Sequence, residues 1–320
     1  MIKLLFKITA FIYFLYINNF YTKVSFANIV VISYENFNNE NLNVETVKNH
    51  IKILTKEKYF IFPTHNIIDL LTKSKTLPNY SVAITISSNK KQMITKIWPI
   101  FAKASLPFTL FIDPYVINKN NAYMSWKDIN VLKNNGVEIG IRSSPKNIIK
   151  NINLYKNKLN INPTSYIYKK GIWSEEEISK LESNNIKIAF TDNSGPISKH
   201  MYKYRLPRFN VASKFSHNNR LETILDTLPL EVRDILPQGN TIKNNPPLYG
   251  FTLINEKHLP VCYTNNKNKA AVSIINKNRV EVRTREFLGS KVRINCISKN
   301  SNNRLLWHGS LYWINKKSNY

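Results

Sequence analysis

The chain has 320 residues, of which 43% are hydrophobic and 12% aromatic, and 46 basic against 20 acidic residues leave a formal charge of +26. This composition is typical of a folded protein with a large core and excludes a disordered chain. The eight glycines match neither a Walker loop, nor a dinucleotide-binding fingerprint, nor a nucleophile elbow, so these nucleotide-binding and hydrolase classes lack their usual signature.

Residues 1–27 have the layout of a secretory signal peptide. Lys3 and Lys7 are followed by an apolar run to residue 17, and Ser25 and Ala27 supply the small residues that precede a cleavage site. We expect cleavage before Asn28 and a periplasmic or secreted protein; if the segment stays uncleaved, it is a membrane anchor. The run is too short to span a bilayer by itself, and no later segment is apolar enough, so no stable membrane span is expected after cleavage.

Export affects how the cysteines and the charge are interpreted. Cys262 and Cys296 would lie in an oxidising compartment, where a pair of cysteines is more often a disulfide than a metal site. The lysine excess is spread along the whole chain, which favours compositional drift or a basic surface facing anionic envelope polymers. No segment concentrates the charge, so nucleic acid is not an expected partner.

Up to about residue 190, short apolar β-branched runs alternate with helical patterns. Ser125 with Asp128 predicts the start of a helix that Gly136 ends, and Ser174 with Glu177 predicts a capping box. Such alternation predicts a parallel sheet, open or closed into a barrel, with functional residues at the carboxyl ends of its strands. We predict seven strands, at 29–34, 59–62, 82–86, 108–112, 137–141, 165–168 and 186–190.

The pattern changes after residue 209. A helix near 220–227 leads into a turn-rich stretch with two prolines in sequence at 246–247, and strand-like runs then follow without helices. We therefore place an α/β domain at 28–234 and a small β-rich domain, a sandwich or barrel, at 235–320. Its predicted strands are 248–254, 270–275, 280–284, 292–297 and 305–314.

The strand ends of the first domain resemble the polysaccharide deacetylases of the NodB-homology group, carbohydrate esterase family four. The segment VAITISSN at 82–89 is similar to the family's first motif, Thr-Phe-Asp-Asp-Gly, and NGVEIGIRSSPK at 135–146 is similar to the second, which contains two histidines. YIYKKGIWS at 166–174, AFTDNSGP at 189–196 and LPRF at 206–209 follow in the family's order. The resemblance implies a distorted (β/α)7-type barrel in an exported bacterial protein of carbohydrate metabolism, with a hydrolase fold for carbon-nitrogen bonds.

The family's reactive residues are replaced in this chain. The resemblance implies a general base and a metal-binding aspartate at Ser87 and Ser88, and two metal-binding histidines at Arg142 and Lys146. A serine hydroxyl cannot replace a carboxylate as a general base or as a ligand of the catalytic metal. In addition, a cation about 4 Å from a divalent ion is repelled by roughly 8 kcal/mol at an effective dielectric near 20. We therefore expect no catalytic residues and no metal at these degenerate positions, and a protein that is a pseudoenzyme.

Two other functions remain open. Asp113 and Asp192 each follow a predicted strand, and an active deacetylase that uses relocated acids of this kind would need zinc or another divalent metal. Alternatively, a non-catalytic protein binds an envelope polysaccharide or a peptidoglycan-type glycan. The residues for such binding form a basic cleft of Arg142, Lys146, Lys169, Lys170 and Arg208, although substitution after loss of activity would produce the same residues.

Aromatic residues near the carboxyl terminus offer a second glycan surface. Strand alternation places Trp307 and Trp313 on one side of the last predicted strand, next to Tyr312. They would either stack on sugar rings or fill the core of the β-rich domain.

Overall fold

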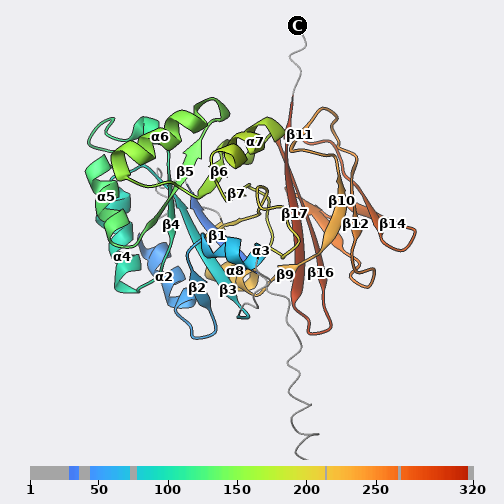
Figure 1. Cartoon of the computed structure of the whole chain (residues 1–320). Helices are drawn as coiled ribbons and strands as arrows, with labels where there is room; N and C mark the ends of the chain where they lie inside the picture. The colour runs from blue at the N-terminus through green and yellow to red at the C-terminus, as the bar shows by residue number, and fades with distance from the viewer. Residues whose placement is uncertain (1–28, 36–43, 73–77, 213–214, 266–267, 316–320) are drawn as a thin grey trace, which may run out of the picture.

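The structure is a computed structural model that describes residues 29–35, 44–72, 78–212, 215–265 and 268–315. An α/β domain and a β-rich domain lie side by side, and the long strands β16 (Lys291–Lys299) and β17 (Leu305–Ile314) of the β-rich domain lie on the side that faces the α/β domain (Figure 1). The expected signal peptide at 1–27 lies outside the described residues. Among the helices that the structure describes, none has the length and hydropathy needed to cross a membrane.

The α/β domain is built on eight parallel strands, hydrogen-bonded in the order β7-β6-β5-β4-β3-β1-β8, with β2 paired to the first half of β3. A parallel bridge from Phe190 to Leu206 joins β7 to the segment that leads into β8, which closes the ring. The strands are β1 (Ile29–Glu35), β2 (Phe60–Phe62), β3 (Ser81–Ser87), β4 (Thr109–Ile112), β5 (Glu138–Ser143), β6 (Ser165–Tyr168), β7 (Ile188–Phe190) and β8 (Phe209–Asn210).

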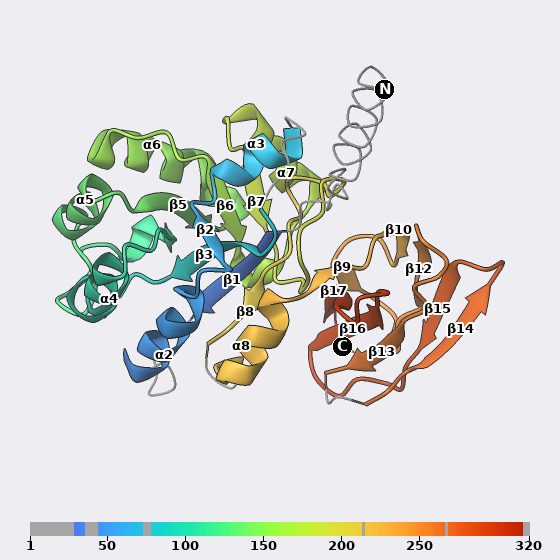
Figure 2. The ribbon, with the colours of Figure 1, turned by 90° about the horizontal axis from the view of Figure 1, so that it is seen from below.

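The barrel strands are apolar on both faces because each strand packs against the barrel interior and against a helix. Val31, Ala83 and Phe111 belong to the inner core, whereas the neighbouring Ile32 and Ile84 pack outward under the helices. The helices stand around the outside of the ring (Figure 2). They are α2 (Val44–Leu54), α3 (Asn66–Thr72), α4 (Trp98–Lys103), α5 (Trp126–Asn134), α6 (Ile148–Leu159), α7 (Glu175–Ser183) and α8 (Asn218–Leu225).

The second domain is a sandwich of two sheets, ordered β10-β12-β15-β14 and β11-β17-β16-β13, with β9 paired to β17. Tyr249 and Phe251 from one sheet meet Ile294 and Tyr312 from the other in a single core. The strands are β9 (Leu228–Pro229), β10 (Val232–Leu236), β11 (Thr241–Ile242), β12 (Tyr249–Leu253), β13 (Val261–Thr264), β14 (Ala271–Ile275), β15 (Arg279–Arg283), β16 (Lys291–Lys299) and β17 (Leu305–Ile314).

The predicted fold class is confirmed, and all seven predicted barrel strands are present. Cys262 and Cys296 form the predicted disulfide, as partners across β13 and β16. The two hydrophobic cores separate between Leu225 and Leu230, whereas the predicted domain division at residue 235 falls inside β10.

The two predicted helix starts are capped in different ways. Ser125 and Asp128 form a complete box at the start of α5. At α7 only half of the box exists, because Ser174 caps the Glu177 amide while the Glu177 carboxylate turns inward and accepts from the Tyr166 hydroxyl at 2.7 Å.

Candidate functional site

The barrel mouth gathers charged side chains from strands that are far apart in the sequence. Glu35 ends β1 and lies beside Ser87, which ends β3, in the parallel register. Both follow outward-facing residues, Tyr34 and Ile86, so both point toward the barrel interior. Arg142 occupies the equivalent position on β5, after the outward-facing Ile141.

Arg208 is the centre of this cluster and is only 3% exposed. One of its terminal nitrogens, Nη2, donates to Glu35 Oε1 at 2.9 Å and to Asp192 Oδ1 at 3.1 Å, and Nε donates to the Thr191 carbonyl at 3.2 Å. The other terminal nitrogen, Nη1, is buried and has no hydrogen-bond partner among the described residues, as is also true of Ser87 Oγ.

Burial and the neighbouring Asp192 carboxylate raise the pKa of Glu35, and Arg208 and Arg142 act in the opposite direction. A third guanidinium comes from the β-sandwich: Arg293 on β16 interacts electrostatically with Asp192 and Glu35, while its burial lowers its pKa. Three arginines therefore face two carboxylates at the barrel mouth, which leaves this region positive when all five groups are ionised.

The structure separates the five residues of the expected basic cleft into different environments. Arg142 is half-buried in the mouth and makes no hydrogen bond to any described residue, and Lys146 and Lys169 are exposed. Lys170 is also exposed; its carbonyl accepts from Trp313 Nε1 of the second domain at 3.0 Å, and its ammonium nitrogen lies 5.5 Å from the centre of the Trp313 ring. Arg208 is buried and bound to the carboxylates of Glu35 and Asp192, so it differs from the exposed lysines of the expected cleft.

The residues at the mouth do not fit a divalent metal. Ser87, Ser88, Arg142 and Lys146 provide no carboxylate or imidazole, and Ser88 Oγ already accepts from the Lys90 amide at 3.2 Å. Asp113 accepts from the Tyr115 amide at 3.1 Å, and Asp192 is paired with Arg208. Within the described ranges, no group of three or more His, Cys, Asp or Glu side chains is arranged to hold a metal ion.

The aromatic side chains of β17 fall on two faces. Trp307 and Trp313 do share one face, but this face packs on the barrel: the Trp307 ring lies 5.4 Å from that of Phe209. Tyr312 points the other way into the sandwich core, 6.0 Å from Tyr249. The tryptophans thus hold the two domains together and are not a freely exposed stacking surface.

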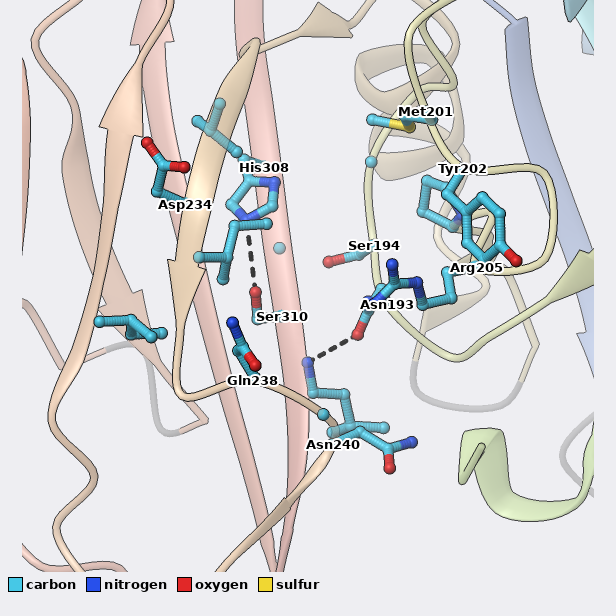
Figure 3. Close-up of a pocket in the computed structure, with 18 of the residues that line it drawn as sticks. Asn193, Ser194, Met201, Tyr202, Arg205, Asp234, Gln238, Asn240, His308 and Ser310 are labelled. Carbon is cyan, nitrogen blue, oxygen red and sulfur yellow. Dashed lines mark hydrogen bonds between the residues drawn. The ribbon is translucent and has the colours of Figure 1, made fainter. Parts of the chain in front are cut away.

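A cavity of about 700 Å³ lies between the domains, beside this β17 face. Figure 3 shows Asn193, Tyr202 and Arg205 on its barrel side, and Asp234, Gln238, His308 and Ser310 on its sandwich side. The Asn193 side-chain oxygen accepts from the Leu311 amide at 2.8 Å, which links the two walls. Trp173 and Trp307 add aromatic surface.

Comparisons with known proteins agree with this architecture at the level of the fold. No protein-family model matches the sequence, and no curated protein is similar to it in sequence. Among solved structures, the Streptococcus pyogenes deacetylase PplD, in complex with acetate, superimposes with a TM-score of 0.56 at 16% identity, covering 62% of this chain and 99% of its own. The first domain has a polysaccharide deacetylase fold.

Two further solved structures support the same fold assignment. IcaB from Ammonifex degensii gives a TM-score of 0.55 at 13% identity, covering 62% of this chain and 95% of its own. A de-N-acetylase from Aggregatibacter actinomycetemcomitans gives 0.51 at 11% identity, covering 61% of this chain and all of its own. These superpositions show a shared fold alone, because the sequence identities are 16% or lower.

Sequence reasoning missed Glu35, Arg293 and the interdomain cavity. Glu35 had a detectable signal, since it is a carboxylate directly after an apolar strand in a fold that uses strand ends. Arg293 had no detectable signal in the sequence, because it alternates with buried residues in the same way as any outward-facing residue of a β-sandwich strand. Only the packing of the domains brings it to the barrel mouth.

Proposed function

We propose that this protein is an exported, non-hydrolytic relative of the polysaccharide deacetylases that binds an acidic envelope glycan at its barrel mouth. The observation that carries the proposal is the set Ser87, Ser88, Arg142 and Lys146 at the strand ends. Hydrolysis of an N-acetyl group needs a metal-activated water and a base that takes its proton. Hydroxyls, a guanidinium and an ammonium group supply neither function.

The donors of the mouth favour an anionic ligand. Arg208 Nη1 and Ser87 Oγ are buried without hydrogen-bond partners in the described structure, and Arg142, which interacts electrostatically with Glu35, makes no hydrogen bond to the described residues. A sugar carboxylate accepts two hydrogen bonds from a guanidinium, and the exposed Lys146 adds attraction at the rim. Glu35 and Asp192 hold Arg208 in place, so the site is preorganised before a ligand arrives.

The first experiment tests the loss of hydrolysis. We expect the purified protein to contain no stoichiometric zinc after dialysis against zinc-containing buffer, and to release no acetate from tetra-N-acetylchitotetraose, the uncharged tetramer of N-acetylglucosamine that is called chitotetraose below. Bound zinc together with acetate release would instead establish an active enzyme that uses relocated acids such as Asp113 and Asp192.

The second experiment tests glycan binding by calorimetry with tetragalacturonate. The double variant Arg142→Glu, Lys146→Glu should bind at least about tenfold more weakly than the wild type, because two attractive charges become repulsive. The matched control is Lys156→Glu, Lys158→Glu, which makes the same change of net charge on exposed lysines at the end of α6. Wild-type protein that does not bind tetragalacturonate, or an equal loss in both double variants, would contradict the proposal.

A further inference from the structure

The cavity between the domains has a lining that differs from the rest of the protein. The whole chain carries more than two basic residues for each acidic one. The cavity lining instead contains three acidic residues, Glu175, Glu231 and Asp234, and two arginines, Arg205 and Arg279. The formal charges of these five residues nearly cancel. The cavity is therefore unsuited to a polyanion and favours an uncharged ligand.

Arg205 is a preorganised donor at this cavity. Its guanidinium carbon lies 4.6 Å from the centre of the Trp173 ring and 4.9 Å from that of Tyr202, so two aromatic rings hold it. The Tyr202 hydroxyl donates to Glu182 at 3.2 Å, which fixes the ring in turn. The Arg205 side chain forms no ion pair or hydrogen bond with the described residues, which leaves its donors available to a ligand.

Other polar groups of the lining are also available. The amide oxygen of Asn193 is bound to β17, which leaves its NH₂ group as a donor. The side chains of Gln238 and Glu231 make no hydrogen bond within the ranges that the structure describes. Tyr202, Leu236 and Ile254 are 40%, 46% and 53% exposed at the same cavity, so apolar surface lies next to these polar groups.

We propose that this interdomain cavity is a second binding site, which takes an uncharged oligosaccharide. A sugar ring has an apolar C–H face, suited to aromatic and aliphatic side chains, and an edge of hydroxyls that both donate and accept hydrogen bonds. Planar amide, carboxylate and guanidinium groups pair with such hydroxyls. The volume of about 700 Å³ is that of a small-ligand site, large enough for a short oligosaccharide. This site is independent of the proposed function of the barrel mouth.

The test is calorimetry of the whole protein with chitotetraose as the probe. The wild type should bind one chitotetraose, and Arg205→Ala should weaken binding by about tenfold through the loss of charge-assisted hydrogen bonds. Gln238→Ala, at an exposed side chain without partners, provides a second variant that removes ligand contacts and preserves the fold. Lys203→Ala is the matched control, because it removes an exposed cation two residues away that does not line the cavity.

The variants separate the two sites. Arg142→Glu, Lys146→Glu should bind chitotetraose as the wild type does, and Arg205→Ala should bind tetragalacturonate as the wild type does. Absence of chitotetraose binding by the wild type would overturn the second site, as would binding that Arg205→Ala and Gln238→Ala leave unchanged. Chitotetraose binding that is lost in the Arg142, Lys146 variant would also overturn it, since the sugar would then occupy the barrel mouth.

Discussion

Arg208 shows how one buried side chain determines the character of the barrel mouth. Its guanidinium forms ion pairs with the carboxylates of Glu35 and Asp192, which are mostly buried and therefore have little contact with water. A buried charge is tolerated when it is paired and hydrogen-bonded, and removal of one partner leaves the others without compensation. The cluster therefore depends on all three residues together.

We predict that Arg208→Ala lowers the free energy of unfolding by about 3–5 kcal/mol. In the Arg208→Ala background, Glu35→Gln should recover part of the loss because it removes one of the two unpaired carboxylates. Urea denaturation of the single and double variants measures both effects. Arg233→Ala is the control: its ion pair with Asp234 is exposed, so a loss below about 1 kcal/mol is expected. Equal losses in Arg208→Ala and Arg233→Ala would contradict the role of the cluster.

Glu177 gives the protein a pH-dependent stability. Burial raises its pKa to about 7, against the effect of the hydrogen bond from Tyr166, while an unfolded glutamate titrates near 4.5. Between these two values the folded protein holds a proton that the unfolded chain releases, so the free energy of unfolding falls as pH rises from 4.5 to 7. Above pH 7 the contribution is constant.

Glu177→Gln should remove this pH dependence, which amounts to about 3 kcal/mol, because glutamine still accepts from Tyr166 and carries no charge. Urea denaturation at pH 4.5, 6 and 8 measures the difference between variant and wild type. Glu176→Gln, on the exposed side of the same helix, should keep the wild-type slope. Parallel pH profiles for Glu177→Gln and the wild type would show that Glu177 titrates normally.

At the scale of single elements, β17 explains why the domains keep a fixed relation. Its Gly309 pairs with Ser194 of the barrel, and the Gly309 carbonyl accepts from the Ser194 amide at 3.2 Å. A Cβ atom at 309 would lie 2.7 Å from the Ser194 carbonyl oxygen, which is too close for any real contact. Only glycine allows the barrel loop to approach the strand in this way.

Gly309→Ala should therefore lower the free energy of unfolding by about 1–3 kcal/mol, the range for an overpacked site. It should also weaken chitotetraose binding, since it displaces one wall of the cavity. Gly289→Ala is the matched control, because a Cβ atom there meets no close neighbour. Thermal unfolding and calorimetry provide the two measurements, and equal behaviour of the two alanine variants would exclude a close contact at Gly309.

The elements differ in how far the sequence predicts them. Barrel strands such as β3 and β6 were located within about one residue, because parallel strands that are buried on both faces appear as continuous β-branched runs. The short strands β9 and β11, with two residues each, carry no periodicity and were missed. At the site, the motif resemblance singled out Ser87 and Arg142, which both lie at the carboxyl ends of barrel strands. The position of Arg293 depends on the packing of the domains, which has no local signal in the sequence.

At the scale of the whole molecule, the charge of +26 and the nearly balanced cavity predict two different responses to salt. Salt screens attraction between an acidic polymer and a basic surface, with a Debye length that falls from about 14 Å at 50 mM to about 7 Å at 200 mM. Tetragalacturonate binding should weaken by about tenfold over this range, while chitotetraose binding should stay constant. Calorimetry at both concentrations tests this, and parallel salt dependence would indicate one shared site.

The pairing of β17 also has a consequence for the order in which parts of the protein can fold during synthesis. β9, directly after the barrel, pairs with Leu306 and Trp307, and β11 pairs with Trp313 and Ile314. Neither strand can form these hydrogen bonds until β17, the last strand, has been synthesised. Until then the interdomain cavity lacks the part of its wall that residues 307–312 of β17 form. A chain that ends before residue 305 would therefore have its barrel sequence complete and lack the β17 wall of the interdomain cavity.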